Sequence, residues 1–374
     1  MITKLKIKNY KSLENIEINL QPLTVLIGPN NAGKSNIFDS LKCLRELLSQ
    51  PQQNPFELRG GFEQVVFNGE IENRRILWDI LFYNNKEEFN YILEYAGGKG
   101  SQAVKKEILK KKNNIFLENI GGQYKLFRES DNKSFSSGGV EPSYPIVGKF
   151  GDPGYDPSSF QIREIIQNWK LFFLDPIKMK TLSTGGRSDN LKEDGSNLWQ
   201  VIHTIFNEEP EIRDAINDTL KLVSGVKGIL SPLLESGHAY GKLVEENINF
   251  ATSSWSISDG ILRLLALEAI SYFPRSDTIC IEEPENGIHP HLLETVADIL
   301  KSTSKETQVI ISTHSVHLLN YLAERTSLDS IIILWKEKGK TRLESASNIK
   351  DINKFLSKIG FGDLWFSGSI GGIH

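Results

Sequence analysis

The chain has 374 residues and carries 43 Lys and Arg against 47 Asp and Glu, which gives a net charge of −4. A hydrophobic share of 39% and a charged share of 24% are those of an ordinary globular protein and argue against wholesale disorder. With two cysteines, no apolar run long enough to span a bilayer and a mildly acidic balance, the composition excludes a disulfide-rich secreted protein, a membrane-spanning protein and a polycationic nucleic-acid coat, and we expect a cytoplasmic protein.

The first fifty residues predict strands followed by a helix. Apolar and charged residues alternate over 2–9 and again over 16–20, which is the pattern of half-buried strands. The continuous apolar run 23–27 predicts a strand covered on both faces. A Gly- and Asn-rich loop, 28–33, leads into a predicted helix whose apolar positions between 37 and 48 recur at helical spacing.

The next hundred residues predict an antiparallel β-rich lobe, because short apolar stretches alternate with Gly- and Asn-rich breaks. Its predicted strands are 64–67, 76–82, 91–95 and 115–117. Residues 130–160 are rich in Ser, Gly and Pro and predict a linker or an exposed loop.

The remaining residues predict helices and buried strands. The predicted helices are 162–169, 198–206, 212–222, 261–269, 291–303 and 316–323. The predicted buried strands are 278–281, 309–311 and 331–334. This alternation is typical of an α/β fold with a parallel sheet that is covered on both faces. We expect a discontinuous core of residues 1–55 and 251–374, a β-rich lobe at 56–159 and a helical insertion at 160–250.

Residues 28–35 read Gly-Pro-Asn-Asn-Ala-Gly-Lys-Ser and fit the pattern G-x-x-x-x-G-K-S between a strand and a helix. The glycines let backbone N–H groups wrap a phosphate, and the helix N-terminus adds partial positive charge. Lys34 would reach the β- and γ-phosphates, and the Ser35 hydroxyl would ligate Mg²⁺. A plain Gly-rich turn is the alternative, which the flanking strand and helix disfavour.

Two further strands end in polar side chains. The run 279–281 leads into Glu282 and Glu283, of which one carboxylate can hold Mg²⁺ and the other can orient or deprotonate a water. Taken alone, the pair could be two solvated glutamates. The run 310–312 leads into Thr313 and His314, and this histidine would lie level with the carboxylates and could sense a γ-phosphate.

The segment Ser258-Asp259-Gly260 precedes a helix rich in Leu and Ala. Its serine and aspartate would be good N-cap residues in any protein. The functional interpretation is a helix N-terminus that offers the serine hydroxyl and the glycine N–H to a phosphate.

The order of these motifs resembles that of the ABC-type ATPases, specifically the SMC/RecF/OLD-like branch. The resemblance is carried by Asn9-Tyr-Lys-Ser12 and 28–36 in front and by 258–314 behind, and it is weak from about 56 to 190. The stretches 258–267 and 283–290 look like those of short bacterial AAA-family or RecF-like ATPases. The resemblance implies an ABC-type ATPase head, in which helices cover a mixed P-loop sheet, with the β-lobe and helical insertion added.

The resemblance also implies which residues contact the nucleotide, taken as ATP with Mg²⁺. In one subunit they are Lys11, Ser12, Gly28, Asn30, Asn31, Ala32, Gly33, Lys34, Ser35 and Asn36. In a second subunit, Ser258, Asp259 and Gly260 would cap the γ-phosphate.

For the chemistry, the resemblance implies catalytic roles for Lys34, for Glu283 as the general base and for His314 as the switch histidine. The Mg²⁺ ligands would be Ser35 and Glu282, with Gln64 as a Q-loop candidate. Two departures from the usual pattern matter. Glu282 stands where most ABC proteins have Asp, and Ser-Asp-Gly replaces Leu-Ser-Gly-Gly-Gln, which favours the soluble DNA-linked branch over transporters.

These observations predict an ATP-dependent dimerisation switch, a homodimer with ATP between two heads. By the resemblance, such ATPases work with a separate nuclease or toxin-like effector in DNA repair or phage defence, without a membrane partner. After His314 the chain lacks the Glu and Asp-x-Asp set of a TOPRIM nuclease. The alternatives are a transporter ATPase subunit and a scaffold that binds ATP without hydrolysing it; the absence of an Asn-Lys-x-Asp motif disfavours a GTPase.

Two other features stay open. Five lysines between 105 and 112 could contact DNA phosphates or could be ordinary solvated surface. The Gly- and aromatic-rich tail, 360–372, could pack on its own domain or dock a partner.

Overall fold

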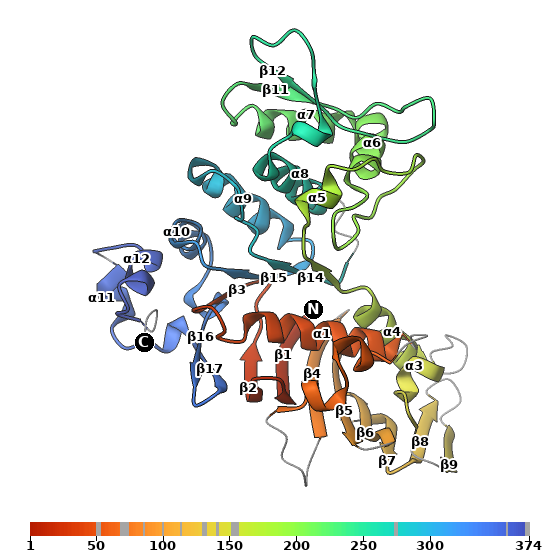
Figure 1. The fold of residues 1–374 in the computed structure, drawn as a ribbon. Helices are drawn as coiled ribbons and strands as arrows, with labels where there is room; N and C mark the ends of the chain where they lie inside the picture. The colour runs from red at the N-terminus through yellow and green to blue at the C-terminus, as the bar shows by residue number, and fades with distance from the viewer. Residues whose placement is uncertain are drawn as a thin grey trace. The chain divides into compact units, whose positions relative to one another are not determined.

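The computed structural model describes residues 1–49, 54–67, 75–84, 87–98, 101–112, 114–128, 133–139, 142–150, 157–272, 276–356 and 358–370. The chain forms two compact units, each assembled from separate stretches of sequence (Figure 1). The first unit comprises 1–21, 27–169 and 332–345, and the second comprises 22–26, 170–331 and 346–374. The boundaries of these two units differ from those expected for the core, the β-rich lobe and the helical insertion. The expected division stays a prediction.

The first unit is built on an eight-stranded antiparallel sheet in the order β2-β1-β4-β5-β6-β7-β8-β9. Its strands are β1 Ile2–Tyr10, β2 Leu13–Asn19, β4 Arg75–Asn84, β5 Glu87–Gly98, β6 Ser101–Lys111, β7 Asn114–Ile120, β8 Gln123–Arg128 and β9 Lys133–Gly138. The β-rich lobe is antiparallel, as predicted, and continues the N-terminal strands because β1 pairs with β4.

Helices in the first unit pack along one side of this sheet (Figure 1). They are α1 Lys34–Leu48, α2 Phe62–Val65, α3 Ile146–Phe150 and α4 Pro157–Gln167, with a 3₁₀ turn at Glu57–Arg59. The core here is rich in aromatic side chains, since Trp78, Phe82 and Tyr91 are fully buried. The ring of Phe82 stacks on that of Trp169 with 6.2 Å between centroids.

Two predictions for this unit are wrong. Residues 64–67 were expected to form a strand, but α2 covers Gln64 and only Val66 makes an isolated bridge, to Tyr10. The helix forms because Phe62 and Val65, three residues apart, are both buried, and Phe62 packs on the ring of Tyr95. The expected loop at 130–160 contains β9 and α3, whose sequences carry little periodic signal.

The second unit contains a largely parallel sheet in the order β10-β14-β15-β3. Its strands are β3 Leu23–Ile27, β10 Lys170–Phe172, β14 Thr278–Glu282 and β15 Gln308–Thr313. The continuous apolar runs are buried, as predicted. Because β14 and β15 are parallel and in register, with Glu282 opposite Ser312, the polar residues after them emerge at the same edge of the sheet.

Helices and a small sheet complete this unit. The helices are α5 Pro176–Met179, α6 Leu198–Glu208, α7 Pro210–Leu220, α8 Asp259–Tyr272, α9 Leu293–Thr303, α10 Val316–Arg325, α11 Ile352–Leu356 and α12 Phe361–Phe366. The small antiparallel sheet is β11 Val226–Leu230, β12 Lys242–Glu245 and β13 Thr252–Ser253, and it packs on α7 (Figure 1). The hairpin β16 Ile331–Glu337 and β17 Lys340–Ser345 lies almost wholly in the first unit. Across the described residues, none of the helices has the length and apolarity that a bilayer crossing requires.

The C-terminal tail packs on its own unit through α12 and α10. A Cβ on Gly362 would lie 2.1 Å from the carbonyl oxygen of Val316, so only glycine permits this approach. Asn320 links the two helices, because its Oδ1 accepts from the N–H of Gly362 at 2.6 Å and its Nδ2 donates to Asp363 at 2.9 Å. Packing thus accounts for Gly362 and for the buried side chains of Phe361 and Trp365, whereas the Phe366 side chain is exposed. Residues 371 and 372 lie outside the described residues.

Candidate functional site

The loop 28–35 has the backbone of a phosphate-binding turn. Asn31 and Gly33 have φ of 68° and 110°, and Gly33 stands directly before α1. A Cβ on Gly28 would lie 2.3 Å from the carbonyl oxygen of Leu334, and one on Gly33 would lie 2.1 Å from Oγ1 of Thr341. Both glycines are therefore required, and successive N–H groups in such a loop form an anion-binding concavity.

Lys34 and Ser35 open α1 with the chemistry that a Mg²⁺–nucleotide needs. The Lys34 side chain is buried, and its Nζ donates to the carbonyl oxygens of Gly28 and Pro29 at 2.8 and 3.1 Å. The ammonium group thus folds back over the loop, where phosphate oxygens would replace the carbonyls. Ser35 is exposed at the start of α1, and its hydroxyl is the hard oxygen ligand that Mg²⁺ prefers. These residues fit the predicted nucleotide and cation.

A chain of hydrogen bonds supports the loop from the side of β17. Asn36 Nδ2 donates to Ser12 Oγ at 2.8 Å, Ser12 Oγ lies 2.7 Å from Thr341 Oγ1, and Thr341 Oγ1 donates to the carbonyl oxygen of Ala32 at 2.8 Å. Ser12 was predicted to lie near the nucleotide, and its largely buried hydroxyl takes part in this support. Thr341 was missed because one threonine in a short strand far from any motif carries no signal.

Lys11 is held against α1 by an acidic residue. Its Nζ lies 2.6 Å from Oδ2 of Asp39, which also accepts from the Tyr10 hydroxyl at 2.7 Å, while Arg59 Nε donates to Oδ1 at 2.8 Å. Burial raises the pKa of Asp39, but the hydrogen bonds from Lys11 and Tyr10 and the Arg59 charge outweigh it, so the pKa lies below its usual value. Lys11 therefore lies beside the P-loop helix as an ion-paired group.

In the second unit, Glu283 and His314 come together as predicted. Glu282 ends β14, and Glu283 follows with a strained φ of 46° while its N–H donates to the carbonyl oxygen of Ser312 at 2.9 Å. The Glu283 carboxylate accepts from Asn286 Nδ2 at 2.7 Å, and its other oxygen lies 3.6 Å from His314 Nε2. A carboxylate and an imidazole at this separation can orient and deprotonate a water.

The segment Ser258-Asp259-Gly260 forms the exposed N-terminus of α8. The Ser258 hydroxyl accepts weakly from the N–H of Ile261 at 3.4 Å, and Asp259 lies 2.7 Å from Lys180 Nζ. A Cβ on Gly260 would lie 2.2 Å from the carbonyl oxygen of Gly287, so this glycine lets α8 approach the turn that follows Glu283. The N-capping interpretation and the phosphate-capping interpretation are both compatible with this geometry.

Arg263 lies one turn further along α8 and was not singled out from the sequence. Burial lowers the pKa of Arg263, and the charges of Asp259 and Glu283 oppose that effect. The guanidinium group is thus within electrostatic range of both the α8 N-terminus and the candidate base.

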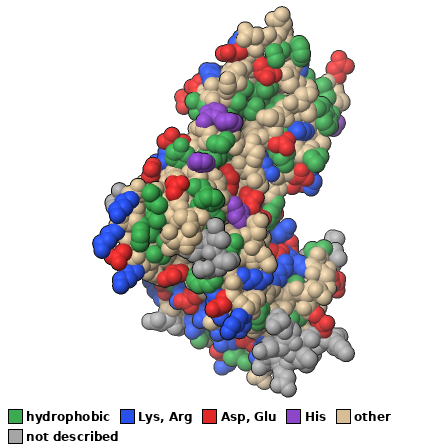
Figure 2. Space-filling view, turned by 60° about the vertical axis from the view of Figure 1, so that its left-hand side comes forward, with side chains coloured by type: hydrophobic (Ala, Val, Ile, Leu, Met, Phe, Trp, Pro, Cys, Tyr) green, Lys and Arg blue, Asp and Glu red, His purple; other side chains and the backbone are tan. Residues whose placement is uncertain are grey.

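Two further features singled out from the sequence are Gln64 and the five lysines between 105 and 112. Gln64 is exposed on α2, and its metal role stays a prediction. Of the five lysines, Lys111 already pairs with Glu87 at 3.0 Å and lies over the ring of Phe89. On the face shown in Figure 2, Lys and Arg side chains are mixed with Asp and Glu.

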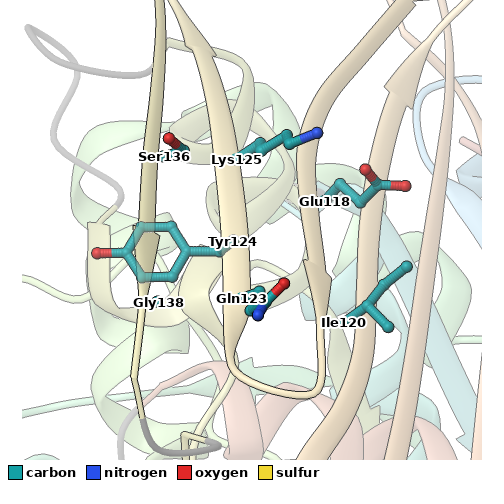
Figure 3. Close-up of a pocket in the computed structure, with 7 residues that line it drawn as sticks. All are labelled: Glu118, Ile120, Gln123, Tyr124, Lys125, Ser136 and Gly138. Atoms are coloured by element: carbon teal, nitrogen blue, oxygen red, sulfur yellow. The ribbon is translucent and has the colours of Figure 1, made fainter.

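An open hollow of about 570 Å³ lies on the outer strands of the eight-stranded sheet, away from the motifs in the sequence. Its floor is one face of β7, β8 and β9, on which Glu118 and Lys125 are cross-strand neighbours (Figure 3). The exposed side chain of Ile120 lines the same hollow. The polar, shallow floor is typical of an exposed sheet face.

Comparisons with known proteins identify the family. Residues 23–320 match the family described as "AAA domain, putative AbiEii toxin, Type IV TA system". The chain is 26% identical to the Old nuclease of Escherichia phage P2 over 85% of its length and 22% identical to Endonuclease GajA of Bacillus cereus over 81%. It spans only 57% and 53% of those two proteins. It is also 19% identical to an ATP/GTP phosphatase of Helicobacter pylori, covering 86% of this chain and 87% of that one.

Solved structures show the same fold. An SMC head bound to the C-winged helix domain of ScpA matches with a TM-score of 0.56 and 16% identity, over 92% of this chain and 97% of that one. An SMC head with an extended coiled coil from Pyrococcus furiosus, bound to the C-terminal domain of ScpA, matches with a TM-score of 0.55 and 16% identity, over 96% and 99%. The chain belongs to the AAA-domain family above and has the fold of the ABC-type ATPase heads of the SMC/RecF/OLD-like branch.

Proposed function

We propose that this protein binds and hydrolyses ATP with Mg²⁺ and that the nucleotide controls the association of two copies. The observation that carries the proposal is the loop 28–35, in which positive-φ residues and two sterically required glycines precede α1, with Lys34 folded over the loop. This geometry supports phosphate binding, and the Glu283–His314 pair supports hydrolysis.

In this mechanism the chain's own residues position charges and move one proton. The loop N–H groups and Lys34 hold the β- and γ-phosphates, and Ser35 and Glu282 would hold Mg²⁺, which neutralises charge developing on the phosphate oxygens. Glu283 accepts a proton from the attacking water, whose oxygen bonds to the γ-phosphorus as the bond to ADP breaks. His314 orients the same water.

The dimer part of the proposal rests on the exposed N-terminus of α8. Ser258 and Asp259 are exposed, and nearby Trp255 has 57% of its surface accessible. A second copy would bring this surface onto the bound γ-phosphate, so that each copy completes the other's site. To shift the pair of copies from mostly separate to mostly associated, the nucleotide must bind the associated state more tightly by about 5.5 kcal/mol. Charge-assisted hydrogen bonds to two buried phosphates can supply this difference.

The output of the switch is proposed from the relatives. Two of them are named as nucleases, the family description names a toxin, and this chain spans about half of each nuclease. We propose that the ATPase acts with a separate nuclease or toxin-like effector in DNA repair or phage defence, and that the β-rich lobe or the residues 160–250 bind that partner or DNA. Co-purification with the product of the adjacent gene, and ATPase rates with and without duplex DNA, test this part.

Two variants test the core of the proposal. Lys34→Ala removes the ammonium group that holds the phosphates and should abolish binding of a fluorescent ATP analogue. Glu283→Gln keeps the site's shape but cannot accept the proton, so it should bind ATP, release no phosphate and elute as a dimer in light-scattering chromatography. Wild-type protein that binds ATP but releases no phosphate would indicate a scaffold, and a Glu283→Gln variant that stays monomeric with ATP would refute the sandwich.

A further inference from the structure

The turn after Glu283 contains a carboxyl group that the mechanism above does not use. Glu285 Oε1 accepts from the Thr313 hydroxyl at 2.6 Å and from the N–H groups of His314 and Ser315 at 3.0 and 3.2 Å. The three donors are the last residue of β15 and the two residues that follow it. One oxygen of Glu285 therefore fastens the turn after β14 to the segment that carries His314.

This attachment fixes the two groups on which hydrolysis depends. Glu283 is two residues before Glu285 and is held at an unfavourable φ of 46°. Such a conformation is unfavourable and persists only where surrounding contacts enforce it. The N–H bond from Glu283 to Ser312 is one such contact, and the Glu285 carboxyl supplies the others across the same two segments.

The second oxygen of Glu285 distinguishes this carboxyl from an ordinary ion-pair partner. Oε2 is buried and has no hydrogen-bond partner among the described residues. Burial, with a smaller effect from the charge of Glu283, raises the pKa of Glu285, while hydrogen bonds from the Thr313 hydroxyl and from the N–H groups of Glu285 itself and His314 oppose that shift. A proton on Oε2 would leave Oε1 free to accept and would avoid a second negative charge beside the base.

We propose that Glu285 is a positioning residue for hydrolysis, which sets the separation between the Glu283 carboxylate and the His314 ring. The proposal rests on the proposed function, in which Glu283 is the base. Glu285 acts through the backbone and side chains of the 313–315 segment and does not itself contact the nucleotide. It should therefore affect kcat and leave nucleotide affinity unchanged.

The test compares three variants in steady-state phosphate release and nucleotide binding. Glu285→Ala removes the acceptor, and because a misplacement of about 1 Å can cost about 100-fold, we expect kcat to fall by about that factor with Kd for ATP unchanged. Glu285→Gln keeps an oxygen acceptor in the same place and should restore most of the rate. Glu294→Ala, which removes an exposed glutamate of α9, is the matched control and should behave as wild type.

A second measurement separates this idea from the proposed function. The ring signals of His314, assigned with a His314→Gln variant in the NMR spectrum of labelled histidines, should move in Glu285→Ala and hold their positions in Glu285→Gln. Thr313→Val, which removes one donor and leaves the carboxyl, should show an intermediate shift. If wild type does not hydrolyse ATP, the proposed function fails but the histidine shifts still decide on Glu285. Unmoved His314 signals, or a loss of ATP affinity in Glu285→Ala, would overturn the positioning role.

Discussion

The direction of each hydrogen bond in the chain behind the P-loop follows from the groups themselves. Thr341 has one hydroxyl proton, and it goes to the carbonyl oxygen of Ala32, which can only accept. Ser12 must then donate to Thr341, and Asn36 donates to Ser12. Because the chain ends in the bond from Thr341 to Ala32, the loop's conformation depends on a residue 309 positions away in sequence.

We therefore predict that Thr341→Val weakens both the fold and nucleotide binding. Valine has a similar shape but leaves the Ala32 carbonyl and the Ser12 hydroxyl proton without their partner in a buried place, at a cost of about 1–3 kcal/mol in the free energy of unfolding. Denaturant titration measures this loss. Because the loop of the variant must be reordered when it binds phosphate, at an added cost of about 1.4 kcal/mol, we expect ATP affinity to fall about tenfold. Thr341→Ser keeps the hydroxyl and should bind like wild type. Equal ATP affinity in Thr341→Val would show that the loop holds its shape without β17.

Sequence patterns predicted the elements whose side chains repeat locally and missed those that depend on distant partners. The runs before Gly28, Glu282 and Thr313 are continuous and apolar, so their strands were evident. Helix α2 has only four residues, and its formation depends on packing against Tyr95. The helix propensities of four residues say nothing about a contact with a residue in another strand.

The same distinction applies to the candidate site. The P-loop, the Glu282–Glu283 pair and His314 are local patterns with a known chemistry, and sequence alone was enough to select them. The support from Thr341 and the bond from Glu285 to the 313–315 segment join residues that no spacing connects. Their roles follow only from three-dimensional contacts.

At the scale of elements, a buried glutamate joins β6 to α3. Glu107 is fully buried, and its carboxyl accepts from the Tyr91 hydroxyl at 2.8 Å and from the N–H groups of Ile146 and Val147 at 2.6 and 3.0 Å. Burial raises the pKa of Glu107 to about 7, although these hydrogen bonds oppose the shift. The carboxyl thus takes up a proton on folding at near-neutral pH.

This raised pKa predicts a pH dependence of stability. A carboxyl with a higher pKa in the folded state stabilises the fold below its unfolded pKa of about 4.5, and that contribution is lost as pH rises through about 7. The shift corresponds to about 3 kcal/mol. Glu107→Gln cannot titrate, so the difference in free energy of unfolding between wild type and variant should change by about that amount from pH 4.5 to pH 8. Denaturant titrations at several pH values measure it, and a constant difference would contradict the prediction.

At the scale of the whole molecule, the proposal pairs two copies: the P-loop of one copy and the α8 N-terminus of the other form each site. If two copies share their sites, a defect in the P-loop of one copy and a defect in α8 of the other need not fall in the same site. That property separates a shared site from one completed within a single chain.

A mixing experiment uses this property. The Lys34→Ala variant lacks the ammonium group that holds the phosphates. The Ser258→Arg variant blocks the exposed N-terminus of α8 with a bulky charged side chain. Each protein alone should therefore release no phosphate. In a mixed dimer, one site pairs the intact P-loop of the Ser258→Arg copy with the intact α8 of the Lys34→Ala copy. Only mixed dimers contain a working site, and each has one in place of two, so we expect phosphate release above that of either variant alone and at most half of the wild-type rate. Because a site completed within one chain would contain a defect in every copy, a mixture as inactive as its components would refute the shared site.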